Sequence, residues 1–542
     1  MKNIKVLDCT LRDGGRIINC EFRDSDIVNM TEELTEANID IIEMGFLRSH
    51  DLVNYRANST FFTEAAQITP FIPKNRKNSM YVAFIDFDMY DFSVLEKCDG
   101  NSVTGIRVGF TKKQFDNKLN EIKKALLRVK AQGYKLFIQA VNALAYSDRE
   151  MLDLLDLVNE IQPYSYGIVD TYGAMYLEDI VRFYNLVDHN LNKEICIDIH
   201  SHNNFQLSFA FAQEIIRLSG DTRNIILDAT LDGMGKCAGN LNTELIVDYL
   251  NRKKQYDYDF NKILDIIDEY IYLIKKDNQW GYSIPAFMAG IYKSHPNNVI
   301  YLTEKFRLNT KDIKNMISMI DEDVRQRYDY DNIERIYIDY NQGNSENVKN
   351  MEHLKEKFKG KKVLLLVPGN SLVEEKEKID AFVKSEKPII ISVNFETTYR
   401  DAYVFWGNSR RYHSSERTGM CSNEIICTNV VKDDSELCLV DYNLLINRGY
   451  KFFDNSTMMV LNLLKKLNPR EIYIAGFDGF SKDKANNFVD ESFADRRYVE
   501  EFDLINQELE KMTKEYYLSV KDSIKISFLT SSRFEKAIID GI

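Results

Sequence analysis

The sequence predicts an α/β protein that begins with a (β/α)₈ TIM barrel and a helical extension and continues into a Rossmann-like open α/β domain. Three observations predict this fold. Short strands recur at regular intervals through the first half, amphipathic helices lie between them, and a new strand–turn–helix pattern begins near residue 361. A chain of 542 residues is too long for one ordinary core. We therefore expect domains at 1–254 and 351–542, with a helical extension and linker at 255–350.

Eight β-branched runs define the predicted barrel. Amphipathic stretches such as 24–38 and 117–133 separate them. The runs recur at intervals of roughly 25–40 residues, close to the ~31 expected when ~250 residues form eight βα units. An open doubly wound sheet fits this period less well. The runs span residues 4–10, 39–46, 80–87, 105–110, 135–141, 165–173, 195–202 and 225–233.

Composition and charge exclude several classes of protein. An apolar fraction of 44% and a charged fraction of 28% are typical of soluble globular proteins. A net charge of −13 argues against a nucleic-acid binder or an anionic-membrane surface protein. The chain has neither a long apolar run nor a signal-peptide start, and its eight cysteines form no CxxC pair. We expect a cytoplasmic protein with reduced thiols, no membrane span and no nucleic-acid partner.

Polar residues gather at the carboxyl ends of the predicted strands, where barrel enzymes place their chemistry. These residues are Arg12, Asp13, Glu43, Asp170, Thr171, His200 and His202, with a glycine-rich loop at 232–240 after the eighth strand.

The seventh predicted strand suggests a metal site. His200 and His202 are two residues apart on an extended strand, so both imidazoles point to the same side. With Asp13 from the first strand, they offer mixed nitrogen and oxygen ligation that suits Mn²⁺, Mg²⁺ or Zn²⁺. Asn240 adds a carbonyl oxygen to this predicted shell. The alternative is a histidine pair that only hydrogen-bonds loops.

Other strand-end residues suit substrate contacts. A guanidinium beside a divalent cation, as expected for Arg12, can stabilise an enolate, although an ion pair with Glu43 is also compatible with the sequence. Thr171 is either a donor to a substrate carboxylate or a plain turn residue. Cys237 is either a catalytic thiol or a small buried residue, and the second interpretation is favoured.

Five motifs at these strand ends resemble the HMG-CoA lyase-like metallolyase superfamily, also called the DRE-TIM family, and most closely its 4-hydroxy-2-oxovalerate aldolase branch. The motifs are TLRDGG (10–15), IEMGF (42–46), VDTYG (169–173), HSHNN (200–204) and GMGKCAGN (233–240). The resemblance covers residues 1–250 and implies a divalent-metal-dependent enzyme that cleaves or forms a C–C bond next to a pyruvate-type enolate.

The resemblance also implies residue roles. Asp13, His200 and His202 would bind the metal, most often Mn²⁺ or Mg²⁺, while Arg12 stabilises the enolate and Thr171 holds the ketoacid. Arg16, Asp170 and Cys237 are predicted to line the substrate site, and Glu43 completes the family's Asp–Arg–Glu set. Two alternatives remain open: a Claisen-type acyltransferase of the isopropylmalate synthase kind, and a non-catalytic scaffold.

Arg16 departs from the aldolase pattern. It occupies the place where the hydroxy-oxovalerate aldolases carry a histidine base, and a guanidinium cannot act as a base near neutral pH. The charge of Arg16 favours a phosphorylated or acidic substrate. Tyr172 and a hydroxide on the metal remain alternatives for the base.

The predicted C-terminal domain opens with a strand that ends in Gly369-Asn370-Ser371 before a helix, an arrangement that presents backbone N–H groups to a phosphate. The strings VPGNSL and IYIAGFDGF resemble a Rossmann-like group that includes bacterial sialyltransferases and relatives from surface-glycan gene clusters. We expect a nucleotide or nucleotide-sugar near Gly369, Ser371, Asn394 and Asp478, with a domain serving only assembly as the alternative. The whole chain is then expected to act in surface-glycan or unusual sugar acid biosynthesis, as a homo-oligomer with a small oxoacid or aldehyde substrate.

Overall fold

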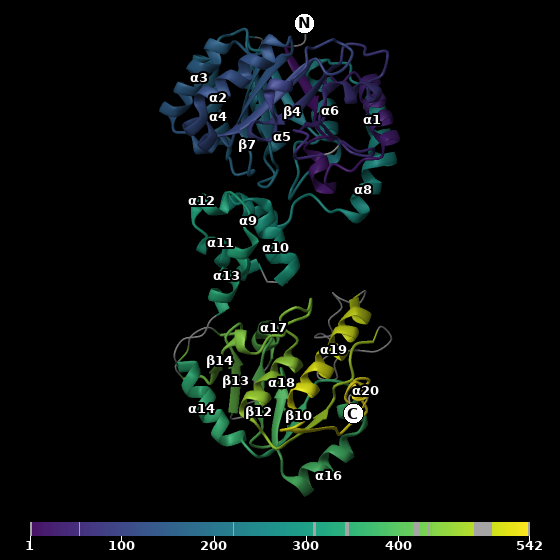
Figure 1. Cartoon of the computed structure of the whole chain (residues 1–542), viewed down its shortest axis with the longest axis vertical. Helices are drawn as coiled ribbons and strands as arrows, with labels where there is room; N and C mark the ends of the chain where they lie inside the picture. Colours follow the sequence, from purple (N-terminus) through teal and green to yellow (C-terminus); the bar gives the residue numbers. More distant parts are fainter. Residues whose placement is uncertain are drawn as a thin grey trace. The chain divides into compact units, whose positions relative to one another are not determined.

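The computed structural model divides into two compact units, Met1–Tyr330 and Asp331–Ile542, which are described separately (Figure 1). It describes residues 3–53, 55–220, 222–306, 310–341, 346–415, 423–431, 434, 436–481 and 501–539. The three-part division predicted from the sequence stays a prediction.

The first unit contains a closed barrel of eight parallel strands, as predicted. Closure occurs because β1 (Ile4–Asp8) pairs in parallel with both β9 (Ile225–Ala229) and β2 (Ile41–Leu47). A two-residue strand, β3 (Phe61–Phe62), pairs with the carboxyl end of β2. The remaining barrel strands are β4 (Met80–Asp86), β5 (Gly105–Thr111), β6 (Lys135–Val141), β7 (Ser165–Asp170) and β8 (Cys196–Ser201).

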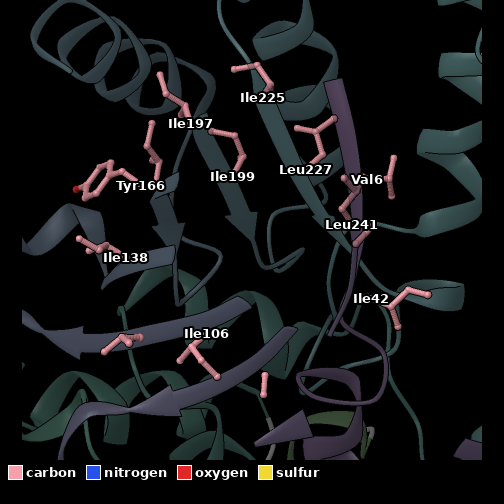
Figure 2. Close-up of a cluster of buried hydrophobic side chains, with 14 of the residues drawn as sticks. Val6, Ile42, Ile106, Ile138, Tyr166, Ile197, Ile199, Ile225, Leu227 and Leu241 are labelled. Carbon is pink, nitrogen blue, oxygen red and sulfur yellow. The ribbon is translucent and has the colours of Figure 1, made fainter. Parts of the chain in front are cut away.

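Amphipathic helices cover the outside of the barrel (Figure 1). Their starts are encoded locally: Ser147 caps α3 by accepting a hydrogen bond from the Glu150 N–H, and the Glu150 side chain caps in return. Strands and helices meet in one apolar cluster, in which Ile42, Ile106 and Ile138 lie on the outer side of their strands (Figure 2). The helices are α1 (Asp24–Glu36), α2 (Lys112–Ala131), α3 (Asp148–Ile161), α4 (Leu177–Asn190), α5 (Ser208–Ser219) and α6 (Thr243–Lys254).

The inside of the barrel is layered. Because side chains alternate along a strand, the neighbours of the outward residues point inward. Their lowest layer is apolar and includes Ile41, Val82 and Phe137. The next inward positions carry buried polar and charged side chains instead of the branched apolar residues that usually fill such barrels. These are Glu43, Arg107, Gln139, Asp198 and Asp228.

Helices after the barrel contact the loops at its carboxyl end. The Trp280 indole N–H donates to the Asp232 carbonyl at 2.8 Å, and the Tyr172 hydroxyl donates to the Gln326 carbonyl at 3.2 Å. The helical extension therefore packs against the carboxyl end of the barrel. Its elements are α7 (Phe260–Ile266), a π-helical turn (Ile267–Ile271), α8 (Tyr272–Asp277), α9 (Ile284–Ile291), α10 (Pro296–Phe306), α11 (Thr310–Met319) and α12 (Glu322–Arg325).

The second unit contains an open sheet of seven parallel strands in the order β14-β13-β12-β11-β10-β15-β16. The strand order changes direction beside β10 (Lys362–Leu366), so the loops after β10 and β15 (Glu471–Ala475) flank a topological switch point. The other strands are β11 (Ile389–Val393), β12 (Tyr403–Trp406), β13 (Asn423–Cys427), β14 (Leu439–Val440) and β16 (Lys525–Phe528).

Helices pack around this sheet (Figure 1). The longer ones are α14 (Glu346–Phe358), α16 (Lys376–Glu386), α18 (Ser456–Leu467) and α19 (Phe502–Val520), and the shorter ones are α15 (Ser371–Glu374), α17 (Ser409–Ser414) and α20 (Glu535–Ile539). Before them, α13 (Tyr330–Asn341) contacts this unit through the Tyr337 hydroxyl, which is 2.8 Å from that of Tyr442. Across the described part of the chain, every helix is too short or too polar to cross a membrane.

Arg223 provides a test of barrel packing. Its fully buried guanidinium pairs with Asp188 at 2.6 Å and donates to four backbone carbonyls. Arg223→Met should lower the free energy of unfolding of the barrel by about 3–5 kcal/mol, because it leaves these acceptors without their donor. Urea denaturation would measure this. Arg217→Met, at an exposed pair with Glu214, should cost less than about 1 kcal/mol, and equal effects would contradict the packing described.

Candidate active site

A fully buried guanidinium organises the charged layer inside the barrel. Arg107 on β5 donates to Glu43 at 3.1 Å, to Asp198 at 3.0 Å, and to Asp228. Burial, with the charge of Asp228 next, raises the pKa of Asp198 to about 7. The network thus joins strands β2, β5, β8 and β9 at one height.

Arg12 links this layer to the mouth of the barrel. Its Nε donates to Glu43 Oε2 at 2.6 Å and its Nη1 to Asp13 Oδ1 at 2.6 Å. Its Nη2 makes no hydrogen bond with a described residue. Both roles considered for Arg12 are therefore compatible, since an ion pair with Glu43 leaves donors free for a ligand.

The two histidines and Asp13 lie together. The Nε2 atoms of His200 and His202 are 4.0 Å and 3.8 Å from Asp13 Oδ2. The Nδ1 of His200 hydrogen-bonds Asp228 Oδ2 at 2.9 Å, which leaves Nε2 to face Asp13. This is the carboxylate–histidine support that metal-binding imidazoles usually have.

These residues fit a divalent cation. One ligand atom each from Asp13, His200 and His202 lies within 4.8 Å of the others. The Asn240 side chain reaches Asp13 through Nδ2 at 3.0 Å, while its buried Oδ1 has no hydrogen-bond partner in the described part of the chain. An orphaned carbonyl oxygen beside two imidazoles and a carboxylate is the donor set expected for a mixed nitrogen–oxygen site.

The ionisation states suit ligation. Burial lowers the pKa of both His200 and His202 to about 4, so both imidazoles are neutral at pH 7. Burial acts to raise the pKa of Asp13, but Arg12 and the two histidines outweigh it and hold that pKa well below its usual range. Neutral imidazoles and an ionised carboxylate are the forms that bind a metal.

An irregularity in β2 shapes the wall of the site. The register with β4 shifts between Glu43 and Phe46, and Gly45 lies between them with φ of +143°. A Cβ at Gly45 would lie 2.1 Å from the Thr60 carbonyl oxygen, so only glycine fits. The shift lets Glu43 and Phe46 both face the interior.

Arg16 lies on the exposed side of this wall. Its guanidinium is 4.7 Å from the Phe46 ring centre, and its Nε is 3.4 Å from Asp13 Oδ1. The side chain is 39% exposed, compared with 5% for that of Arg12. The structure thus places Arg16 at the entrance to the candidate metal site.

Three other predicted residues make mainly local contacts. Thr171 Oγ1 accepts a hydrogen bond from the Asn142 N–H, and Asp170 accepts from the Ala174 and Met175 N–H groups. Burial raises the pKa of Cys237 to about 12, so its thiol stays protonated at neutral pH. Within the described residues, no hydrogen bond or ion pair joins their side chains to Asp13, His200 or His202.

Tyr172 is poorly suited to act as a base. Its hydroxyl donates to the Gln326 carbonyl, and burial raises its pKa to about 12.

Three residues of this network, Arg107, Asp198 and Asp228, are not among those predicted from the sequence. Each is a charged residue within an otherwise apolar strand segment, in IRVGF, ICIDIH and IILDA. Such isolated charges are the signal that could have revealed them, because buried charges occur almost only in pairs.

In the second unit, three of the four predicted nucleotide-site residues meet at the switch point. Ser371 donates to Asp478 through its backbone N–H at 2.8 Å and through Oγ at 2.5 Å, and a Cβ at Gly369 would touch the same carboxylate. Asp478 therefore occupies the N–H group that a phosphate would use. Asn394, directly after β11, accepts hydrogen bonds from the backbone N–H groups of Gly407 and Asn408.

The first unit is thus a (β/α)₈ barrel with a candidate metal centre at its carboxyl end. Residues 3–269, which include the whole barrel, match the family model described as HMGL-like. Members of this family include lyases, aldolases and synthases, and metal binding is typical of them.

Individual relatives are distant. A 4-hydroxy-2-oxovalerate aldolase from Geobacillus thermodenitrificans is 22% identical over 321 residues, which cover 58% of this chain and 89% of the aldolase. A 2-isopropylmalate synthase from a Geobacillus strain is 22% identical over 262 residues, covering 45% of this chain and 47% of the synthase. The chain thus spans about half the length of that synthase. The N-terminal domain of a putative aldolase from Bacteroides vulgatus superposes with a TM-score of 0.48 at 22% identity, covering 56% of this chain and 98% of that domain.

The low pKa of the histidines predicts how metal binding depends on pH. A protonated imidazole cannot ligate, and His200 and His202 gain protons only near pH 4. The affinity for Mn²⁺ should therefore change by less than about threefold between pH 8 and pH 6, then fall steeply below about pH 5. Titration followed by the EPR signal of free Mn²⁺ measures this. A tenfold loss centred near pH 6.5, the ordinary histidine pKa, would contradict the described burial.

Proposed function

We propose that the barrel is a divalent-metal-dependent aldolase or lyase, which cleaves or forms a C–C bond next to a pyruvate-type enolate. The observation that carries the proposal is the position of Asp13, His200 and His202 beside the guanidinium of Arg12. The aldolase named above, of which this chain covers 89%, supports the same reaction class.

The residues divide the work by position. Asp13, His200 and His202 would hold the cation, with Asn240 offering a carbonyl oxygen. A bound Mn²⁺ or Mg²⁺ supplies Lewis-acid polarisation of the substrate's keto and carboxylate oxygens. Arg12 is held by Glu43 and Asp13, and its Nη2 makes no hydrogen bond with a described residue. This guanidinium would stabilise the negative charge of the enolate oxygen.

Burial makes this stabilisation stronger. Arg12 is 4% exposed, and its guanidinium lies 4.5 Å from the Phe84 ring centre. In such a low-dielectric wall, a fixed positive charge interacts with a developing oxyanion more strongly than it would in water. During cleavage, the electron pair of the broken C–C bond passes to the keto oxygen, where this guanidinium lies. A base removes the proton from the substrate's 4-hydroxyl, and Arg16 cannot fill that role.

We propose further that the second unit binds a nucleotide or nucleotide-sugar at the switch point beside Gly369, Ser371, Asn394 and Asp478. Because the Ser371 N–H is already bonded to Asp478, such a ligand would need to displace that carboxylate or bind it through hydroxyl donors. With this domain, the chain would act as a cytoplasmic homo-oligomer in surface-glycan or unusual sugar acid biosynthesis.

The enolisation step can be tested without knowing the aldehyde. Incubating the Mn²⁺-loaded protein with pyruvate in D₂O should replace the methyl protons with deuterium, which is followed by the loss of the methyl signal in ¹H NMR. Arg12→Lys should slow the exchange by about 10²-fold or more. A lysine ammonium cannot keep the contacts with Glu43 and Asp13 and also contact the enolate oxygen.

A matched control is Arg76→Lys, because Arg76 lies outside the site and donates to the Asn101 and Ser102 carbonyls. Its exchange rate should equal that of the wild type. Absence of exchange in the metal-loaded wild type would contradict the proposed function. Release of free CoA from acetyl-CoA with a 2-oxoacid, in place of pyruvate exchange, would favour the acyltransferase.

A further inference from the structure

Outside the candidate metal site, three cations from three different loops lie at the barrel mouth. Arg16 follows β1, Arg48 follows β2, and Lys236 lies in the loop after β9. Arg48 is 8% exposed and pairs with Asp86, so it is neutralised. Arg16 and Lys236 are not neutralised in this way.

Arg16 has unused donors. The two carboxylates near its guanidinium are Asp13 at 3.4 Å and Asp86 at 3.8 Å. Each of these already has a closer guanidinium partner, Arg12 and Arg48 respectively. In the described part of the chain, the Arg16 side chain makes no hydrogen bond at all. It is held by stacking on Phe46, which leaves its N–H groups for a ligand.

The Lys236 ammonium also has few contacts with described residues. Its Nζ donates to Asn297 Oδ1 at 3.3 Å, and no described carboxylate lies within 4.0 Å of it. Burial, followed by the charge of Arg16, lowers the pKa of Lys236. A half-buried ammonium with one weak neutral partner carries a desolvation cost that an anion would relieve.

The two loops are packed together. A Cβ at Gly14 would lie 3.3 Å from the Met234 carbonyl oxygen, and Asn240 bonds Asp13. The segment carrying Arg16 therefore lies against the loop carrying Lys236. Burial, followed by the charges of Lys236 and Arg16, lowers the pKa of His295 in the helical extension to about 4, so this imidazole is neutral at pH 7.

Charge balance separates this pair from the inner network. Inside the barrel, Arg12 and Arg107 form ion pairs with four carboxylates, Glu43, Asp13, Asp198 and Asp228. These groups, a divalent cation and one substrate carboxylate are close to neutral together. Arg16 and Lys236 then remain as two uncompensated positive charges at the entrance.

We infer that Arg16 and Lys236 bind the phosphate group of a phosphorylated substrate, at the end remote from the ketoacid. This rests on the proposed function, because it assigns the other end of the same substrate. One guanidinium is sufficient to bind a carboxylate. A planar guanidinium and an ammonium from two different loops are better suited to a doubly charged, tetrahedral phosphate group.

Calorimetric titration of the full chain with methyl phosphate tests this site directly. Divalent metal is removed with EDTA beforehand so that the phosphate has no cation to bind, and ionic strength is held constant. Methyl phosphate should bind at least about tenfold more tightly than acetate. Arg16→Gln and Lys236→Gln should each weaken it about tenfold or more, since each removes a charge-assisted contact, and Arg16→Lys should weaken it less.

Lys253→Gln serves as the matched control, because Lys253 is exposed at the end of α6 and should leave binding unchanged. The inference is overturned if wild-type protein gives no binding heat, if acetate binds as tightly as methyl phosphate, or if the Gln variants bind normally. The two proposals fail separately. Methyl phosphate binding without pyruvate exchange would contradict only the proposed function. Pyruvate exchange without methyl phosphate binding would contradict only the phosphate site.

Discussion

The polar interior of the barrel depends on the buried guanidinium of Arg107. It contacts carboxylates from three other strands, Glu43, Asp198 and Asp228. Removing it would leave these acids buried without a counter-charge, which typically costs about 3–5 kcal/mol. The same carboxylates hold the residues above them, since Glu43 binds Arg12 and Asp228 binds His200. The geometry of the candidate metal site therefore depends on the Arg107 guanidinium.

Such a network is better explained by function than by stability. A packed apolar layer would usually be as stable as buried ion pairs, or more so. The barrel already has that apolar layer one step lower, around Ile41, Val82 and Phe137. The charged layer instead orients two groups: the imidazole of His200, whose Nε2 is left to face Asp13, and the guanidinium of Arg12. Fixing charges before substrate arrives is the main way an active site stabilises an oxyanion.

The entrance of the barrel differs from the inner network in its charge balance. The inner charges are close to balanced within the site, whereas the positive charges of Arg16 and Lys236 are not compensated. These two cations determine which anions the entrance attracts without altering the chemistry at the metal site beneath it. The substrate would then be held by its ketoacid at the metal and by its phosphate at the mouth.

The sequence was sufficient for the eight strands, because their period and their polar ends follow from local patterning. It also brought Asp13, His200 and His202 to one place through strand order. It could not reveal the shift in β2 at Gly45, since a register shift depends on the neighbouring strand and on Thr60, not on local propensity. Nor could it show that Asp478 takes the Ser371 N–H group, because the two are 107 residues apart.

The central claim is that Asp13, His200 and His202 hold one divalent cation. Electron spin-echo envelope modulation of the Mn²⁺-loaded protein tests it most directly, because the method detects nitrogen atoms bound to the manganese. Two imidazole nitrogens are expected in the wild type, and one in each of His200→Ala and His202→Ala. A wild-type spectrum without nitrogen coupling, or one unchanged by both substitutions, would contradict the account.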